Sequence, residues 1–239
     1  MASAIVVGGA GRMGRLVLEE LSARGFDVVG SYDVDNIDEL DELAPAADVA
    51  VDFSAPAALP HVLAYARRTG AALVSGTTGL AADQLDELRA LGERNRVIWA
   101  SNYSLGVAAL RRATAMVART LAGWDVEIVE THHNQKADAP SGTARALVAA
   151  VDPTGERPVV GGREGMVGAR VPGEIGVHAV RGGTVAGTHE VHFFGPDEEV
   201  CLTHRATSRQ IFVTGAVAAA ARLLTREPGF YDFDTLMFG

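Results

Sequence analysis

The stretch "AIVVGGAGRMGRLVLEELSARG", residues 4–25, decides the fold of the first half of the chain. Residues 5–7 are an apolar run that predicts a buried strand, and residues 16–21 place apolar side chains at helical spacing. Glycines let a backbone approach a pyrophosphate, and the start of the next helix offers N–H groups and a positive dipole end. A tight turn that binds no ligand can have the same glycine spacing. The position of these glycines between a strand and a helix favours a dinucleotide-binding turn. The three spaced glycines are Gly8, Gly11 and Gly14.

The next strand, "FDVVGSYD" at residues 26–33, ends at Asp33. An acid about 20 residues past such glycines accepts hydrogen bonds from ribose hydroxyls, and it repels a 2′-phosphate. No Arg or Lys occurs in the following "DVDNIDELDEL", residues 33–43. The sequence therefore favours NADH over NADPH, with the alternative that Asp33 merely begins a loop.

Strand and helix patterns alternate up to residue 104, which predicts an α/β fold with a Rossmann-type, doubly wound parallel sheet. Strand-like runs cover residues 47–54, 71–79 and 96–104, and helical patterns cover residues 56–70 and 81–94. Ligands of such sheets bind at the carboxyl ends of the strands, although ordinary loops are also rich in polar residues. We expect the nicotinamide side of a cofactor to contact Gly76, Thr77, Thr78, Ala100, Ser101, Asn102 and Tyr103.

A different pattern follows a predicted helix at residues 104–123. Strand-like segments at residues 125–133, 176–183, 184–196 and 198–208 predict an α+β domain with an open, mixed and mostly antiparallel sheet. Residues 151–175, rich in Gly, Pro and Arg, predict a long loop. An apolar helix at residues 209–224 is expected to return to the first domain. We therefore expect a dinucleotide-binding domain of residues 1–104 and 209–239, and a substrate-binding and oligomerisation domain of residues 105–208.

The composition limits the classes of function. A net charge of −9 argues against a nucleic-acid binder, although it permits a local cluster of cations for an anionic substrate. No apolar stretch has the length of a membrane span, and no signal peptide is visible, so we expect a cytoplasmic protein. The single cysteine, Cys201, lies in an apolar strand-like run and is expected to be a small buried hydrophobe rather than a nucleophile.

The stretch "ETHHNQKADAPSGTA", residues 130–144, holds Lys136, the only lysine beside 20 arginines. A histidine next to an ammonium suits proton donation. Asp138, Pro140 and Ser141 predict a helix start, whose N–H groups suit a carboxylate. Separately, each feature has an ordinary explanation as a surface charge, an exposed loop histidine or a helix cap. Together they favour an anion site with a proton donor.

The other histidines do not predict a metal site. His189 and His192 are three apart on a strand and face opposite sides, and the pair in residues 132–133 lacks a ligand partner at suitable spacing. We expect packing or interface roles for the remaining three, His61, His178 and His204.

These segments resemble the 4-hydroxy-tetrahydrodipicolinate reductase (dihydrodipicolinate reductase) family over nearly the whole chain. "GAGRMGR", "VDFS", "SGTTG" and "SNYSLGV" look like family segments in the family's order, and "VRGG" and "THRATSR" continue the likeness. The family signature E-x-x-E-x-H-H-x-x-K-x-D-x-P-S-G-T-A is matched from Glu127 to Ala144. The resemblance implies NADH or NADPH reducing a cyclic, conjugated imine dicarboxylate, and a homotetramer built through the second sheet.

The resemblance also implies roles for single residues. His132 matches the family's proton donor and Lys136 its catalytic lysine. The matching substrate-binding positions are His133, Ser141, Gly142, Thr143 and Arg209. The matching cofactor contacts include Gly8, Gly9, Ala10, Gly11, Arg12, Met13 and Asp33. Dual-cofactor members often carry Arg after the acid, and this chain does not, so NADH remains the expected cofactor and NADPH the alternative.

Two other functions share parts of this pattern. Another small-imine or amino-acid dehydrogenase would have the Rossmann half but lack the run from His132 to Thr143. A dinucleotide-sensing regulator would need the nucleotide site but would have no use for Lys136 beside helix-start donors.

Overall fold

The computed structural model describes residues 1–239, which divide into two compact units. Unit 1 consists of Met1–Ser104 and Gln210–Gly239, and unit 2 consists of Leu105–Arg209. The long apolar C-terminal helix thus belongs to the same unit as the N-terminal strand.

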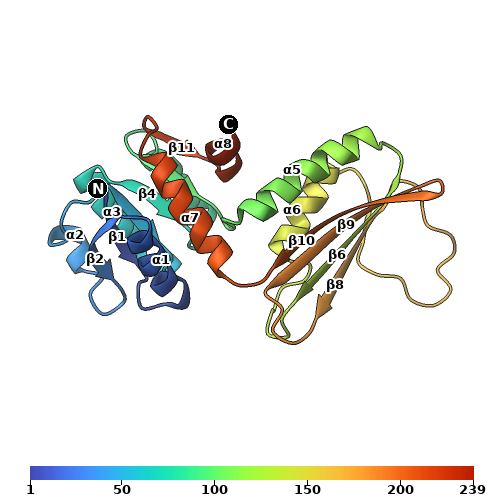
Figure 1. Ribbon diagram of the computed structural model, residues 1–239, viewed down its shortest axis with the longest axis horizontal. Helices are drawn as coiled ribbons and strands as arrows, with labels where there is room; N and C mark the ends of the chain where they lie inside the picture. The colour runs from blue at the N-terminus through green and yellow to red at the C-terminus, as the bar shows by residue number, and fades with distance from the viewer. The chain divides into compact units, whose positions relative to one another are not determined.

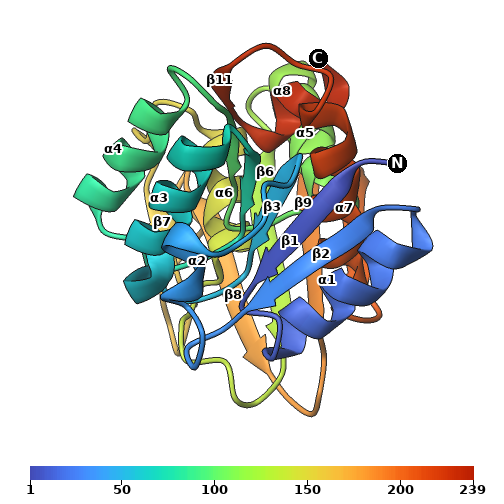
Figure 2. The ribbon, with the colours of Figure 1, turned by 90° about the vertical axis from the view of Figure 1, so that its left-hand side faces the viewer.

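Unit 1 is built on a six-stranded parallel sheet in the order β11-β5-β4-β3-β1-β2 (Figures 1 and 2). Its inner strands are almost entirely apolar because helices cover both faces, as is typical of parallel sheets. The strands are β1 (Ser3–Val7), β2 (Asp27–Tyr32), β3 (Val49–Asp52), β4 (Ala72–Ser75), β5 (Arg96–Trp99) and β11 (Gly229–Tyr231).

The helices of unit 1 lie on both faces of this sheet (Figure 2). On one face, side chains of α3 and α4, such as Leu63 and Leu88, pack with Ile5 and Val7 of β1 in one buried cluster. On the other face, α1 and α7 lie side by side. The bounds are α1 (Arg12–Ala23), α2 (Glu39–Glu42), the 3-10 helix η1 (Pro56–Ala58), α3 (Leu59–Thr69), α4 (Ala82–Leu91), α7 (Gln210–Leu223) and α8 (Phe233–Phe238).

The turn between β1 and α1 requires glycine at two positions. Gly8 has a φ of +84°, and a Cβ there would lie 2.6 Å from the carbonyl oxygen of Phe53. A Cβ at Gly14 would lie 2.0 Å from the carbonyl oxygen of Gly8. The first turn of α1 therefore packs directly on the glycine turn, which holds the start of the helix at the end of β1.

Unit 2 contains a five-stranded mixed sheet in the order β10-β9-β6-β8-β7. The pairs β10–β9 and β9–β6 are antiparallel, whereas β6–β8 and β8–β7 are parallel. Helices α5 and α6 cover one face (Figure 1). The elements are α5 (Leu105–Thr120), β6 (Asp125–His132), α6 (Gly142–Val151), β7 (Val159–Val160), β8 (Ile175–Arg181), β9 (Gly187–Gly195) and β10 (Glu198–Ala206).

Alternation along the strands of unit 2 separates two faces with different chemistry. Val126 and Ile128 of β6 and Val191 and Phe193 of β9 are buried with residues of α5 and α6 in one core. The intervening residues point to the opposite face, which we call the open face because neither α5 nor α6 packs on it. Residues on this face include Glu127, His178, Glu190, His192, Glu199 and Cys201.

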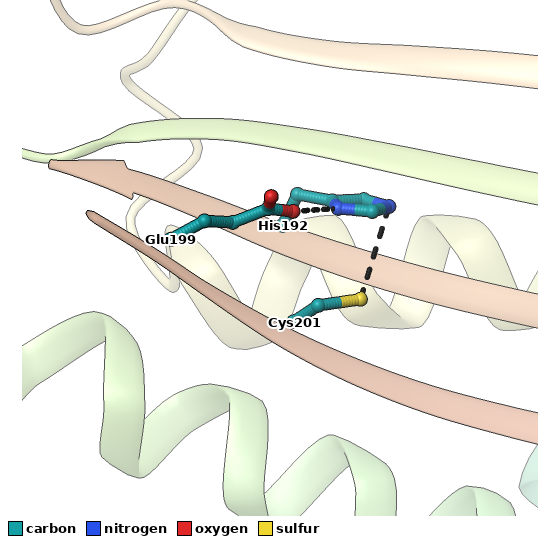
Figure 3. Close-up of side chains that lie close together, drawn as sticks. All are labelled: His192, Glu199 and Cys201. Atoms are coloured by element: carbon teal, nitrogen blue, oxygen red, sulfur yellow. Dashed lines mark hydrogen bonds and ion pairs between the residues drawn. The ribbon is translucent and has the colours of Figure 1, made fainter. Parts of the chain in front are cut away.

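In the second sheet two strand pairs are antiparallel and two are parallel, because α6 carries the chain across the sheet and β8 pairs parallel with β6. The structure confirms the α/β class, the parallel sheet and the second mixed sheet, and it corrects two details. The C-terminal tail, given no element from the sequence, forms β11 and α8. Cys201 is exposed rather than buried, because it lies on the open face of the edge strand β10 (Figure 3). Separately, none of the helices combines the length and apolar character needed to span a membrane.

Candidate active site

A buried carboxylate organises the strand ends of unit 1. Asp52, at the end of β3, is 1% exposed and accepts hydrogen bonds from the hydroxyls of Ser54, Ser75 and Thr77. Burial raises the pKa of Asp52, although these hydrogen bonds act in the opposite direction. The Thr77 hydroxyl also accepts the N–H of Ser54 at 3.1 Å. The loops after β3 and β4 are thereby tied together at the edge where a Rossmann-type sheet binds its ligand.

A pocket of about 340 Å³ opens beside the glycine turn in unit 1. Three of the predicted cofactor residues, Gly8, Gly11 and Asp33, converge on it. The Asp33 carboxylate accepts the N–H of Ala10 at 2.8 Å, so it is fixed against the turn. The lining also includes residues to which the sequence assigned no cofactor role: Val7, Val34, Ile37, Phe53, Ser54, Ala55, Ala57, Ala58 and His61. His61, expected to be a packing residue, lines this pocket and lies 3.0 Å from Asp41.

These residues fit a dinucleotide. A Cβ could not be accommodated at Gly8 or Gly14, so α1 begins directly against the glycine turn, and a helix start in this position is where a Rossmann-type fold binds a pyrophosphate. Arg12 and Met13 form the first turn of that helix. The mainly apolar walls of the pocket suit an adenine ring, and the Asp33 oxygens suit ribose hydroxyls.

The other predicted cofactor residues of unit 1 differ in how far they are exposed to solvent. Gly76 leaves no room for a side chain, because a Cβ would lie 2.3 Å from the Phe53 ring. Tyr103 is 1% exposed and donates its hydroxyl to the carbonyl of Ser75 at 2.8 Å, so its ring is a core element. Thr78 and Ser101 are exposed, whereas Gly9 is buried and Ala100 and Asn102 are half-buried.

In unit 2, the Glu130 carboxylate joins the residues that the sequence singled out. Glu130 is fully buried, and its Oε2 lies 2.5 Å from Nδ1 of His132. Arg181 donates to both carboxylate oxygens at 2.8 Å, and the N–H of Ser141 donates to Oε1 at 2.9 Å. Burial raises the pKa of Glu130, but these hydrogen bonds outweigh it and the pKa lies below its usual range. The carboxylate is therefore ionised and can only accept, which puts the proton on Nδ1 of His132 and leaves Nε2 as the reactive nitrogen.

Local sequence explains why this arrangement forms. Glu130 and His132 are two apart on β6, so both side chains point to the same face of the sheet. Arg181 is the register partner of His132 on β8, and His189 is the register partner of Glu130 on β9. A Cβ at Gly187 would lie 3.1 Å from Nε2 of His132, so the lack of a side chain there leaves space beside that nitrogen.

The start of α6 completes the cluster of residues around Glu130. Ser141 is the N-cap, and its hydroxyl accepts the N–H of Ala144 at 3.1 Å and lies 3.3 Å from Nε2 of His189. Because the N–H of Ser141 is already used by Glu130, it is not a free donor for a ligand. Gly142 begins the helix, is exposed, and has no heavy atom closer than 3.9 Å to its Cβ position. Its backbone is thus accessible to a carboxylate, and half-buried Thr143 follows in the same turn.

Lys136 lies in the loop between β6 and α6. Its Nζ is 2.6 Å from Oδ1 of Asp138, whose backbone carbonyl accepts from Arg181 at 2.7 Å. The loop is also held by the N–H of His133, which donates to the carbonyl of Val185 at 2.8 Å. Arg209, the last residue of unit 2, is exposed. The structure therefore joins His132, Lys136 and Ser141 through Glu130, Arg181 and Asp138, and shows no such link for Arg209.

Sequence reasoning missed Glu130, Arg181 and His189 as members of this cluster. Glu130 could have been found from its place two residues before His132 on a strand. Arg181 and His189 are 51 and 48 residues from their partners in the cluster, and only the strand register reveals them.

His189 is held in its neutral form. It is 3% exposed, and burial together with the charge of nearby His132 lowers its pKa from 6.5 to about 4. A neutral ring beside His132 adds no positive charge to the site at neutral pH. Its Nδ1 has no hydrogen-bond partner, which agrees with a buried ring that is not charged.

We expect His189 to remain neutral far below the usual range of a histidine. Since the unfolded chain binds a proton near pH 6.5 and the folded chain only near pH 4, folding stability falls as the pH decreases from 6.5 towards 4. NMR titration of ring signals, assigned with a His189→Gln variant, should give a midpoint near 4. A midpoint near 6.5 would show that the ring is solvated, contrary to this structure.

Comparison with known proteins identifies the family of this chain. The family profile described as dihydrodipicolinate reductase, N-terminus matches residues 2–103, and the profile described as dihydrodipicolinate reductase, C-terminus matches residues 106–237. The 4-hydroxy-tetrahydrodipicolinate reductase of Natronomonas pharaonis is 42% identical, with 96% of this chain and 98% of the relative covered. That of Akkermansia muciniphila is 43% identical, with 99% and 98% covered.

Among solved structures, dipicolinate-bound dihydrodipicolinate reductase from Paenisporosarcina sp. TG-14 shares the fold, with a TM-score of 0.81 and 22% identity over 99% of this chain and 100% of that one. The WlbA dehydrogenase of Thermus thermophilus, in complex with NAD and UDP-GlcNAcA, is more distant, with a TM-score of 0.52 and 14% identity over 97% of each chain. The two profile matches and the two relatives show that this chain belongs to the dihydrodipicolinate reductase family.

Proposed function

We propose that this chain reduces 4-hydroxy-tetrahydrodipicolinate, by way of dihydrodipicolinate, to tetrahydrodipicolinate in lysine and diaminopimelate biosynthesis. The observation that carries this proposal is the buried Glu130 carboxylate, which joins the His132 ring to the start of α6. Relatives 42% and 43% identical over nearly their full length carry the name of this activity. A bound nicotinamide cofactor supplies the hydride.

His132 is the proposed proton donor. Hydride addition to a conjugated imine places negative charge on the ring of the substrate, and a proton must follow. Glu130 holds the imidazole by Nδ1, so Nε2 is the nitrogen that carries the transferable proton when the ring is protonated. Arg181 balances the Glu130 charge, and His189 adds no positive charge beside the His132 ring at neutral pH, because burial lowers its pKa to about 4.

Lys136 and the start of α6 are the proposed binding groups for the dicarboxylate. Lys136 now pairs with Asp138, an exposed partner that a substrate carboxylate can replace. The accessible backbone at Gly142 lies at the positive end of the α6 dipole, which favours a second carboxylate. His133, Thr143 and Arg209 are proposed as further substrate contacts on the basis of the family signature.

Three finer properties complete the proposal. Asp33 in the nucleotide pocket favours NADH over NADPH, because no arginine or lysine lines that pocket. The open face of unit 2 is proposed to assemble a homotetramer, and the compartment is proposed to be the cytoplasm.

An assay of NADH oxidation with freshly generated substrate tests the activity, and it separates this function from that of another dehydrogenase or of a sensing regulator.

Replacing Lys136 tests the role of the ammonium. We expect Lys136→Ala to lower kcat/KM by about 10²–10⁴-fold, the range typical of a positioned acid–base group. Lys136→Arg should remain about tenfold or more below wild type, because a guanidinium is larger and does not release its proton. Arg89→Ala, which removes an exposed cation of α4, should leave turnover unchanged. Full activity of Lys136→Arg would contradict a specific need for the ammonium.

Replacing Glu130 tests whether His132 is positioned through its Nδ1. We expect Glu130→Gln to lower kcat more than it raises the KM for NADH, and 15N NMR to show loss of the single Nδ1-protonated tautomer of His132. Glu127→Gln is the matched control, because Glu127 is on the same strand, binds Arg163, Arg170 and His178, and faces the opposite side. An unchanged tautomer in Glu130→Gln would refute the positioning role.

The cofactor preference depends on the Asp33 charge. We expect wild type to use NADH with a kcat/KM about tenfold or more above that for NADPH, since like charges disfavour the 2′-phosphate. Asp33→Asn should narrow this ratio, whereas Asp35→Asn, the same charge change on an exposed neighbour, should not. Equal efficiencies with both cofactors in wild type would overturn the preference.

A further inference from the structure

Besides Asp33, the nucleotide pocket of unit 1 has one titratable side chain in its lining, that of His61. This histidine lies in the first turn of α3, on the opposite side of the strand order from β2 and its Asp33. Its side chain is 27% exposed, so the ring is accessible from the pocket. A polar ring in a mainly apolar wall is the feature of this pocket that the binding of pyrophosphate and ribose does not explain.

The His61 ring is held by a carboxylate that does not line the pocket. Nδ1 of His61 lies 3.0 Å from Oδ2 and 3.1 Å from Oδ1 of Asp41 in α2. A carboxylate only accepts hydrogen bonds, so Nδ1 carries the proton, and Nε2 of the neutral ring is an acceptor. Both contacts of the ring with Asp41 use Nδ1, so Nε2 remains available to a ligand.

Packing of α2 on α3 fixes this pair. Leu40 precedes Asp41 and Val62 follows His61, and both of these apolar side chains are fully buried in the same core cluster. The two polar side chains therefore leave the core at neighbouring positions of two helices in contact. The direction of the imidazole is thus set by the fold and by the Asp41 carboxylate together.

The pocket offers different chemistry along its length. The glycine turn suits a pyrophosphate, and Asp33 suits ribose hydroxyls. Val34 is 82% exposed, so a flat ring that covers it removes apolar surface from water. The apolar part of the lining, which suits the faces of a base, consists of Val7, Val34, Ile37, Phe53, Ala55, Ala57 and Ala58.

The edge of a base needs a polar partner. Adenine presents an exocyclic amino group, which is a donor, where hypoxanthine presents a carbonyl oxygen, which is an acceptor. Ser54, the other polar side chain of the lining, already donates its hydroxyl to Asp52. With Asp33 suited to the ribose, Nε2 of His61 is the acceptor of this pocket that matches the amino group of adenine.

We propose that His61 determines the base specificity of the cofactor site by accepting a hydrogen bond at Nε2 from the exocyclic amino group of adenine. Asp41 is the positioning residue, because it holds Nδ1 and so fixes the tautomer in which Nε2 accepts. The inference rests on the proposed function in one respect, namely that this pocket binds an adenine dinucleotide. It adds recognition of the base to the recognition of the ribose by Asp33.

Binding of two reduced dinucleotides tests this inference without the reductase substrate. The probes are NADH and reduced nicotinamide hypoxanthine dinucleotide, and isothermal titration calorimetry at mildly alkaline pH keeps imidazoles neutral. Wild type should bind NADH about tenfold more tightly, because the carbonyl of hypoxanthine places an acceptor against Nε2. Equal affinities would overturn the role of His61 and leave the reductase proposal intact. Absence of NADH binding would overturn both.

Variants of His61 show whether the preference depends on the acceptor. His61→Phe keeps an aromatic ring, so NADH affinity should fall about tenfold while affinity for the hypoxanthine dinucleotide, which also confirms folding, stays unchanged. His61→Gln should retain part of the preference, because its amide oxygen can accept. Equal weakening of both dinucleotides in His61→Phe would show a purely structural role and refute the proposal.

Variants of Asp41 test the positioning role. Asp41→Ala should lower the preference for NADH, whereas Asp41→Asn should keep it, because the amide oxygen still accepts from Nδ1. Glu42→Ala, which removes the same charge from an exposed neighbour, is the matched control and should bind both dinucleotides as wild type does. A wild-type preference in Asp41→Ala would refute the positioning role. Substrate turnover, assayed separately, reports on the reductase proposal alone.

Discussion

The buried Glu130 carboxylate is the interaction on which the site of unit 2 depends. A carboxylate with no exposed surface is stable only when cations or hydrogen-bond donors satisfy it. Here those partners come from three elements, namely His132 on β6, Arg181 on β8 and Ser141 at the start of α6. The pairing of the Glu130 charge thus sets the tautomer of His132. It also fixes the position of Arg181 at the end of β8 and that of Ser141 at the start of α6.

Unit 1 also has a buried, hydrogen-bonded carboxylate at the ends of its strands. Asp52 is buried at the end of β3 and accepts hydrogen bonds from Ser54, Ser75 and Thr77, which fixes the loops after two neighbouring strands. The two carboxylates differ in their partners. Asp52 has only neutral donors, and burial raises its pKa, whereas Glu130 has Arg181, and its pKa is lowered. The first carboxylate organises a binding edge, and the second also controls a proton.

Strand β6 shows how alternation separates two functions on one element. Glu130 and His132 point to the side of α6, and Glu127 points to the open face. Glu127 is held by Arg163, Arg170 and His178; burial raises its pKa, but these partners outweigh that effect and bring it to about 2. The ion pairs of Glu127 with Arg163 and Arg170 therefore persist at any pH near neutrality, and they attach the loop before β8 to the open face.

The sequence by itself determined the features that depend on local spacing. The glycines at 8, 11 and 14, the alternation of strands and helices, and the cap at Ser141 are all readable because a turn, a helix and a cap involve residues a few positions apart. Tertiary structure decided what depends on contacts between distant segments: the partners of Glu130, the exposure of Cys201, the parallel pairing of β8, and the pocket that includes His61. In the sheet of unit 2 these contacts depend on strand register, because a shift of one residue would turn every side chain of the strand to the other face.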